Sequence, residues 1–288
     1  MRIQHNITAL NSHRNLTNNN SSLTKNLEKL SSGYRINRAG DDAAGLAISE
    51  KMRAQITGLQ TAQKNSEDGV SLVQTAEGAL TEVHSMLNRM VELATQSANG
   101  TYSTANRGEM QKEVDALRKE INRISNTANF NGTTLFSKLG AGGTATKAKV
   151  AIHAGETSKL DNQIAITLQK MDTTSMGVKA DGTAIDISKL TVNDATSARL
   201  AIDVINSAID GISSMRSDFG ALQNRLEHTI NNLGVQTENL SAAESRIRDV
   251  DMAKEMMAYT KNNILVQASQ AMLAQANQVP QGVLQLLQ

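Results

Sequence analysis

The sequence contains no cysteine and no tryptophan, and its 288 residues include one proline, three phenylalanines and three tyrosines. The absence of cysteine excludes disulfides, thiolate metal sites and a cysteine nucleophile. A single proline leaves long helices uninterrupted, and scarce aromatic side chains favour thin bundles packed through Ala, Leu, Ile and Met. The composition therefore predicts a mainly helical protein.

Charge and hydropathy give no sign of a nucleic-acid or membrane partner. The 29 basic and 28 acidic residues are spread along the chain and leave a net charge of +1, so no basic patch marks a nucleic-acid surface. No apolar run approaches the roughly 18 residues that a membrane span needs. Residues 1–8 also lack the apolar segment of a secretory signal peptide.

One long apolar seam occupies residues 48–94. Its positions are separated alternately by four and three residues, which is the spacing of a coiled coil. At about 1.5 Å per residue, a helix of this length would extend roughly 70 Å. The seam consists of Ile48, Met52, Gln55, Leu59, Ala62, Ser66, Gly69, Val73, Ala76, Leu80, Val83, Leu87, Met90 and Ala94.

Two further seams complete a predicted antiparallel bundle. A turn-rich break at residues 97–106 is followed by a seam over residues 110–128, which should return along the first helix. A third seam over residues 202–247 matches the first in length. The fold class predicted is mainly α, a long antiparallel helical coiled-coil bundle in which the two chain ends are paired.

The middle of the chain predicts a small β-hairpin region. Asn131 and Gly132 form a pair favoured in tight turns. Two alternating segments, residues 149–153 and 163–168, should pair as strands around Gly155.

The two chain ends carry apolar stripes too narrow to fold alone, so each needs a partner helix. Gly33 is predicted to stop the first helix, Asp41 and Asp42 to cap the next, and Pro280 with Gly282 to end the last. The terminal assembly residues predicted are Ile3, Ile7, Leu10, Leu23, Leu27 and Leu30 at one end, and Val250, Met257, Ile264, Ala268 and Ala271 at the other.

No pattern indicates catalysis, a metal or a cofactor. Asp41 and Asp42 could be an acid/base pair, but no histidine, lysine or nucleophile stands nearby in the sequence to complete a mechanism. The five histidines lie in five separate places without a close ligand pair. A glycine-rich stretch at residues 140–143 lacks the strand and Gly-Lys-Ser/Thr ending of a phosphate loop.

Three long strings carry a family resemblance. They are LSSGYRINRAGDDAAGLAISE at residues 30–50, NRISNTANFNG at residues 122–132, and RDVDMAKE at residues 248–255 with QASQAMLAQANQ behind it at 267–278. Through them the chain resembles bacterial flagellin, the subunit of the flagellar filament, over nearly its whole length. The short middle implies a form without large outer domains.

The resemblance implies a domain organisation and a location. Residues 1–42 with 245–288 would form a terminal coiled-coil domain lining the filament channel, and residues 43–138 with 192–244 a rod-like bundle containing a short variable segment at 139–191. The subunit would leave the cell unfolded through the flagellar type III system. Its expected partners are other copies of itself, an export chaperone, the filament cap and the hook–filament junction proteins.

The resemblance also implies a receptor. Residues 87–96 are similar to the flagellin segment gripped by the vertebrate Toll-like receptor for flagellin, although Val91 stands where a second basic residue is common. The same face could instead pack on residues 110–128 or on the next subunit. The receptor or intersubunit contacts expected are Leu87, Arg89, Leu93, Gln96 and Glu113.

Two other classes of protein remain open at this point. A flagellar junction or hook-associated adaptor would share the terminal helices but would be scarce in sheared filaments. An enzyme would need a catalytic constellation, which the sequence does not display.

Overall fold

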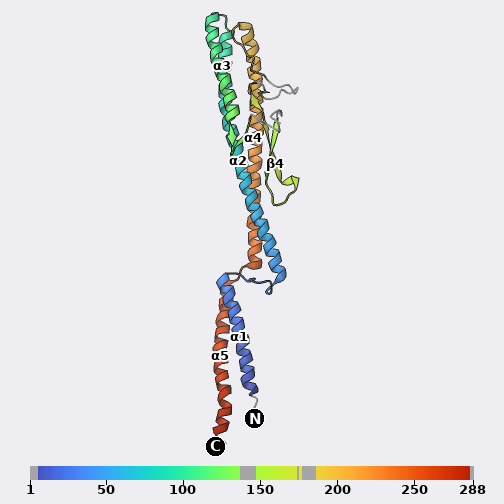
Figure 1. Ribbon diagram of the computed structural model, residues 1–288, viewed down its shortest axis with the longest axis vertical. Helices are drawn as coiled ribbons and strands as arrows, with labels where there is room; N and C mark the ends of the chain where they lie inside the picture. The colour runs from blue at the N-terminus through green and yellow to red at the C-terminus, as the bar shows by residue number, and fades with distance from the viewer. Residues whose placement is uncertain (1–5, 137–146, 174, 177–185, 286–288) are drawn as a thin grey trace. The chain divides into compact units, whose positions relative to one another are not determined.

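The computed structural model describes residues 6–136, 147–173, 175–176 and 186–285 (Figure 1). The prediction of a mainly helical chain is confirmed, because five long helices account for most of the described residues. They are α1 (Ile7–Ser32), α2 (Ala43–Ala98), α3 (Thr104–Thr127), α4 (Ala195–Arg248) and α5 (Met252–Gln285).

Within the described residues, the strands form three small antiparallel pairs, each of two strands. The predicted hairpin is confirmed as β3 (Lys147–His153) paired with β4 (Gln163–Gln169). A 3-10 turn, η1 (Leu160–Asn162), precedes β4, and β5 (Met171–Asp172) pairs with β6 (Ser175–Met176).

The predicted turn at Asn131 and Gly132 is also confirmed. It joins β1 (Asn129–Phe130) to β2 (Thr133–Thr134). Asn131 has φ +48° and Gly132 has φ +78°. These left-handed values explain the residue types, because asparagine and glycine adopt them at little cost.

The chain divides into two compact units. Unit 1 contains residues 1–57 and 237–288, and unit 2 contains residues 58–236. Helices α2 and α4 therefore contribute residues to both units. The domain bounds expected from the resemblance, at residues 42 and 245, concern the assembled filament and stay a prediction.

The core of unit 2 follows the seam predicted on α2. Every position of that seam from Leu59 to Ala94 is buried, including the polar or small residues Ser66 and Gly69. Ser66 is tolerated because its hydroxyl donates to the Ala62 carbonyl at 2.9 Å. At Gly69 a Cβ would lie 3.3 Å from Ile152 of β3, so glycine leaves room for the hairpin to pack closely.

Helices α3 and α4 supply the other walls of this core, as the bundle prediction required. Residues 187–192 close it from the side: Arg118 of α3 donates to the Ser188 carbonyl, and the Val192 amide donates to Gln111 at 2.6 Å. The buried members from α3 and α4 are Val114, Ile121, Ser125, Ala198, Ala201, Ile205, Ala208, Ile212, Met215, Phe219, Leu226 and Leu233.

The prediction that Pro280 and Gly282 end the last helix is wrong, because α5 continues to Gln285. Proline inside a helix removes one backbone donor and leaves the carbonyl four residues earlier without its usual partner. That carbonyl belongs to Ala276, and it accepts a hydrogen bond from the Asn6 side chain at 2.8 Å. A partner from the other end of the chain thus replaces the missing donor.

The buried seam yields a stability prediction. Leu80 has no exposed surface, so Leu80→Ala should lower the free energy of unfolding of unit 2 by about 2–5 kcal/mol through lost contacts and a cavity. The matched control is Leu200→Ala, since Leu200 of α4 is 65% exposed and should change stability by less than about 0.5 kcal/mol. Thermal melting followed by circular dichroism measures both. Equal shifts for the two variants would contradict the assigned core.

Candidate functional site

Helices α1 and α5 lie against each other within unit 1, which confirms the predicted pairing of the chain ends. The contact is partly polar. Asn19 donates from Nδ2 to the Ser269 hydroxyl at 3.1 Å. Asn26, with its amide oriented to satisfy both atoms, donates to Glu255 Oε1 and accepts from Asn262 Nδ2. Apolar packing therefore supplies only part of the contact between these two helices.

This terminal pair leaves much of its apolar surface uncovered. No residue of α1, every one of which the structure describes, is buried. Unpartnered apolar rows of this kind mark interaction surfaces in soluble proteins. The exposed large apolar residues of the pair are Ile7, Leu10, Leu27, Met252, Met256, Met257, Ile264, Leu265 and Met272.

The structure places the predicted terminal residues on two different faces. Leu23 and Leu30 of α1 are half-buried, whereas Ile7, Leu10 and Leu27 are exposed, and Ile3 lies outside the described residues. On α5 the expected row is exposed rather than packed on α1. The α5 residues that form hydrogen bonds with α1 or its N-cap are half-buried and include Glu255, Asn262, Ser269 and Ala276. The exposed row consists of Met257, Ile264, Ala268 and Ala271, while Val250, which precedes the helix, is half-buried.

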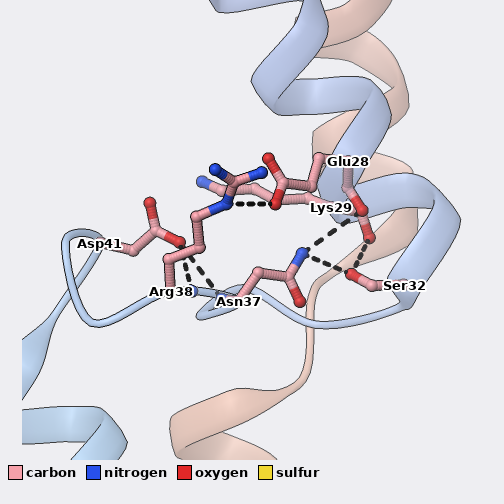
Figure 2. A network of polar contacts seen from close by, with 6 residues as sticks. All are labelled: Glu28, Lys29, Ser32, Asn37, Arg38 and Asp41. Atoms are coloured by element: carbon pink, nitrogen blue, oxygen red, sulfur yellow. Dashed lines mark hydrogen bonds and ion pairs between the residues drawn. The ribbon is translucent and has the colours of Figure 1, made fainter.

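A short loop connects α1 to α2 and is held by side chains (Figure 2). Gly33 ends α1 in the left-handed conformation predicted for a helix stop, with φ +76°. Asn37 Nδ2 then donates to the Ser32 hydroxyl at 2.7 Å and to the Glu28 carbonyl at 3.4 Å. Arg38 forms an ion pair with Glu28 at 2.8 Å. The loop thus turns back onto the last turn of α1.

The two adjacent aspartates of this loop have separate structural tasks. Asp41 Oδ2 accepts the backbone N–H groups of Arg38 at 3.1 Å and Asn37 at 3.2 Å, and these bonds hold the pKa of the Asp41 carboxyl below its usual value. Asp42 accepts the Gly45 amide at 2.9 Å and caps α2, as predicted. Both carboxylates are therefore engaged in backbone hydrogen bonds and do not form an acid/base pair.

Gly45 is required for the close packing of this cap. A Cβ at that position would lie 2.5 Å from Asp42 Oδ2 and 2.9 Å from Ile36 Cδ1. Ile36 is 3% exposed and anchors the loop beneath α2. A larger residue at position 45 would displace either the cap or the anchor.

The start of the same loop pairs with the segment that joins α4 to α5. The Arg35 amide donates to the Arg248 carbonyl at 2.6 Å, and the Val250 amide donates to the Gly33 carbonyl at 3.0 Å. Tyr34 and Asp249 form an antiparallel bridge between these bonds. Both connections between helices are thereby joined through the backbone.

Charged side chains surround Tyr34 at this junction. The Arg248 guanidinium lies 4.9 Å from the centroid of the Tyr34 ring, and that of Arg53 lies 6.0 Å away. Arg248 also pairs with Glu50 at 2.5 Å, and its side chain is only 13% exposed. Arg53 pairs with Glu244 at 3.5 Å. This cation–π and ion-pair cluster ties α2 to the end of α4 within unit 1.

In unit 2, α2 meets α3 through the arginine predicted to contact a receptor or a neighbouring subunit. Arg89 Nε donates to Glu113 of α3 at 2.8 Å, and its Nη1 donates to Glu92 at 2.9 Å. Both pairs are exposed to solvent, so each contributes little to stability. Among the five predicted residues, Arg89, Gln96 and Glu113 form a surface, whereas Leu87 and Leu93 are buried in the core.

In the described ranges, no cluster of His, Asp and Glu side chains could hold a metal ion. No described helix is long and apolar enough to cross a membrane.

Comparison with known proteins decides the family. Residues 3–141 match the bacterial flagellin N-terminal helical region, and residues 202–287 match the bacterial flagellin C-terminal helical region. The chain belongs to the bacterial flagellin family. Full-length relatives agree with this assignment: flagellin from Bacillus subtilis (strain 168) is 54% identical over 305 residues, and flagellin from Halalkalibacterium halodurans is 54% identical over 287 residues. Both alignments cover 100% of each chain.

A solved structure shows the same fold. It is a putative flagellar hook-associated protein from Vibrio parahaemolyticus, 13% identical, with a TM-score of 0.59 over 73% of this chain and 100% of that one. The hook-associated proteins, which the sequence left open as an alternative class, thus share this fold. The full-length identity to flagellins identifies this chain as a structural subunit of the extracellular flagellar filament and not an enzyme.

The junction around Tyr34 yields a prediction for the polymerised flagellin. Arg248→Met keeps the length of the side chain but removes the cation–π contact and the Glu50 pair, so the bridging amides of Arg35 and Val250 should exchange with solvent about tenfold faster. Hydrogen exchange read by mass spectrometry measures this. Arg246→Met is the matched control, because Arg246 is exposed and lies two residues before Arg248, the last residue of α4. Unchanged exchange in Arg248→Met would show that the cluster does not hold the junction.

Proposed function

We propose that this flagellin is exported unfolded through the flagellar type III apparatus and polymerises through its terminal helix pair. The observation that supports polymerisation through this pair is its uncovered apolar surface. Met257 of α5 is 68% exposed and Leu10 of α1 is 65% exposed. Side chains of this size each contribute about 1.5–3 kcal/mol when fully buried, which provides a driving force for association with further copies.

Ordering the ends is unfavourable until other copies cover them. Fixing the backbone alone costs about 1–2 kcal/mol per residue, and α1 has no buried residue to offset this cost. We therefore expect α1 and α5 to become stably ordered as the filament forms. In the filament they would line the channel, with residues 1–42 and 245–288 forming the inner domain.

Composition supports the export route. A chain without cysteine cannot form cross-links while it is unfolded in a narrow channel. Export by this route and a place in the filament require further partners, namely the export chaperone, the filament cap and the hook–filament junction proteins. We propose each of these partners because the chain belongs to the flagellin family.

Truncation tests the role of the terminal pair. Removal of residues 277–288 deletes the last turns of α5, so the shortened chain should stay soluble but fail to extend seeds made from filament fragments. Sedimentation and electron microscopy measure extension, with the full-length chain as control. Thermal melting of the shortened chain should match the full-length chain, since unit 2 is intact. Normal filaments from the shortened chain would show that these turns are dispensable.

We also propose that the vertebrate Toll-like receptor for flagellin contacts the surface formed by Arg89, Gln96 and Glu113. The buried positions of Leu87 and Leu93 restrict the accessible part of the predicted segment to its polar members. If the same surface packs between subunits in the filament, the receptor can bind only free subunits. Assembly and detection would then compete for one face.

Reversal of one charge tests this shared surface. Arg89→Asp should weaken both filament formation and receptor binding, by about 2–5 kcal/mol where the contact is desolvated. Because the Arg89 ion pairs are exposed, the same substitution should change the melting temperature little. Sedimentation and a binding assay on free subunits are run in parallel.

The matched control is Arg123→Asp on α3. Arg123 pairs with Glu120 on its own helix, and its side chain is 60% exposed, so this variant should polymerise and bind as the parent does. If Arg89→Asp also matches the parent in both assays, the Arg89 surface has neither role.

A further inference from the structure

A proline lies inside the last helix and leaves one carbonyl without its usual partner. Helix α5 runs from Met252 to Gln285 and so includes Pro280. In a regular helix the N–H of residue 280 would donate to the carbonyl of Ala276, but proline has no N–H. A helix carbonyl without a donor is unfavourable unless water or another group satisfies it.

Asn6 supplies the missing donor. Its Nδ2 atom donates to the Ala276 carbonyl at 2.8 Å. The Oδ1 atom of the same amide accepts the Ala9 backbone N–H at 3.1 Å, which caps α1. One side chain therefore closes the first turn of α1 and the gap in α5, and its two functions need both the acceptor and the donor of an amide.

Two further asparagines of α1 repeat this link along the pair. Asn19 contacts Ser269, and Asn26 contacts Asn262. The three partner positions on α5, residues 276, 269 and 262, are separated by seven residues each. From Asn19 to Asn26 both helices advance by seven residues in opposite directions, as an antiparallel pair in one register requires. The Asn6 link does not share this repeat, because Asn6 is the N-cap that precedes α1 and lies 13 residues before Asn19.

We propose that Asn6 fixes the axial register of α1 on α5 by binding the carbonyl that Pro280 leaves free. Leucine and methionine contacts are non-directional and can be remade after a slip of one turn. The hydrogen bond cannot, because only Ala276 lacks an intrahelical donor for this reason. A slipped pair would leave both the carbonyl and the Asn6 donor unsatisfied.

The register matters because it aligns the exposed rows of the two helices. Ile7 and Leu10 of α1 and Met272 of α5 lie on the uncovered surface of the terminal pair. Neighbouring subunits can cover both rows at once only if the helices keep a constant offset. This inference rests on the proposed function, namely that polymerisation proceeds through the terminal pair.

The first test removes the donor and keeps the cap. Asn6→Asp retains an oxygen that caps α1 as well as asparagine does, but it has no N–H to give to Ala276. The critical concentration for seeded polymerisation should rise about fivefold to tenfold, as expected for one lost hydrogen bond. The matched control is Asn20→Asp, the same change at an exposed position of α1, for which we expect less than about a twofold change.

Two outcomes separate the inference from the proposed function. If the parent polymerises and Asn6→Asp raises the critical concentration no more than Asn20→Asp does, the register role of Asn6 is overturned. If the parent itself does not extend seeds, the proposed function fails, and the inference that rests on it fails too.

The second test restores the donor from within α5. Pro280→Ala returns an N–H to position 280, which can bond to Ala276 as in a regular helix. Asn6→Ser, which keeps a cap but cannot reach α5, should raise the critical concentration about fivefold in the parent and less than about twofold in the Pro280→Ala background. Equal increases in both backgrounds would show that Asn6 acts only as a cap. If Pro280→Ala by itself abolishes polymerisation, the comparison of Asn6→Asp with Asn20→Asp decides whether Asn6 sets the register.

Discussion

The shortage of apolar contact in the terminal helices governs the rest of this structure. Unit 2 has a continuous core in which residues such as Leu80 and Phe219 are fully or almost fully buried. The α1–α5 pair has no comparable core, and its apolar side chains lie mostly on the outside. A subunit built in this way contains one stable part and one part that other copies must complete, which suits a protein that polymerises.

Polar contacts supply part of the contact within the terminal pair. Asparagines set the contact between α1 and α5, and the cluster of Tyr34, Arg248 and Arg53 joins the two connections between helices. Hydrogen bonds are directional and depend on distance, whereas each contributes only about 0.5–1.5 kcal/mol to stability. They therefore specify one arrangement without making the free pair stable, and the exposed apolar row remains available to neighbouring subunits.

Much of the fold could be predicted because it depends on local periodicity. The spacing of four and three residues gave the buried seam of α2, and Asn131 with Gly132 gave the turn between β1 and β2. The wrong prediction, that α5 ends at Pro280, involves a distant residue. Where α5 continues past Pro280, the Ala276 carbonyl accepts a hydrogen bond from Asn6, which is 270 positions away from Ala276 in the sequence. The α5 row was assigned by hydropathy and stays a prediction for the assembled filament, while within the subunit polar groups of α5 form hydrogen bonds with α1.

Oxidation of methionine tests most directly whether other copies complete the terminal pair. Met252, Met256, Met257 and Met272 of α5 are 49–68% exposed, and Met90 of unit 2 is fully buried. Free subunits and filaments are treated briefly with peroxide, and methionine sulfoxide at each position is measured by mass spectrometry. The account predicts rapid oxidation of the α5 methionines in free subunits, strong protection of them in filaments, and slow oxidation of Met90 in both. Equal oxidation of the α5 methionines in subunits and filaments would contradict it.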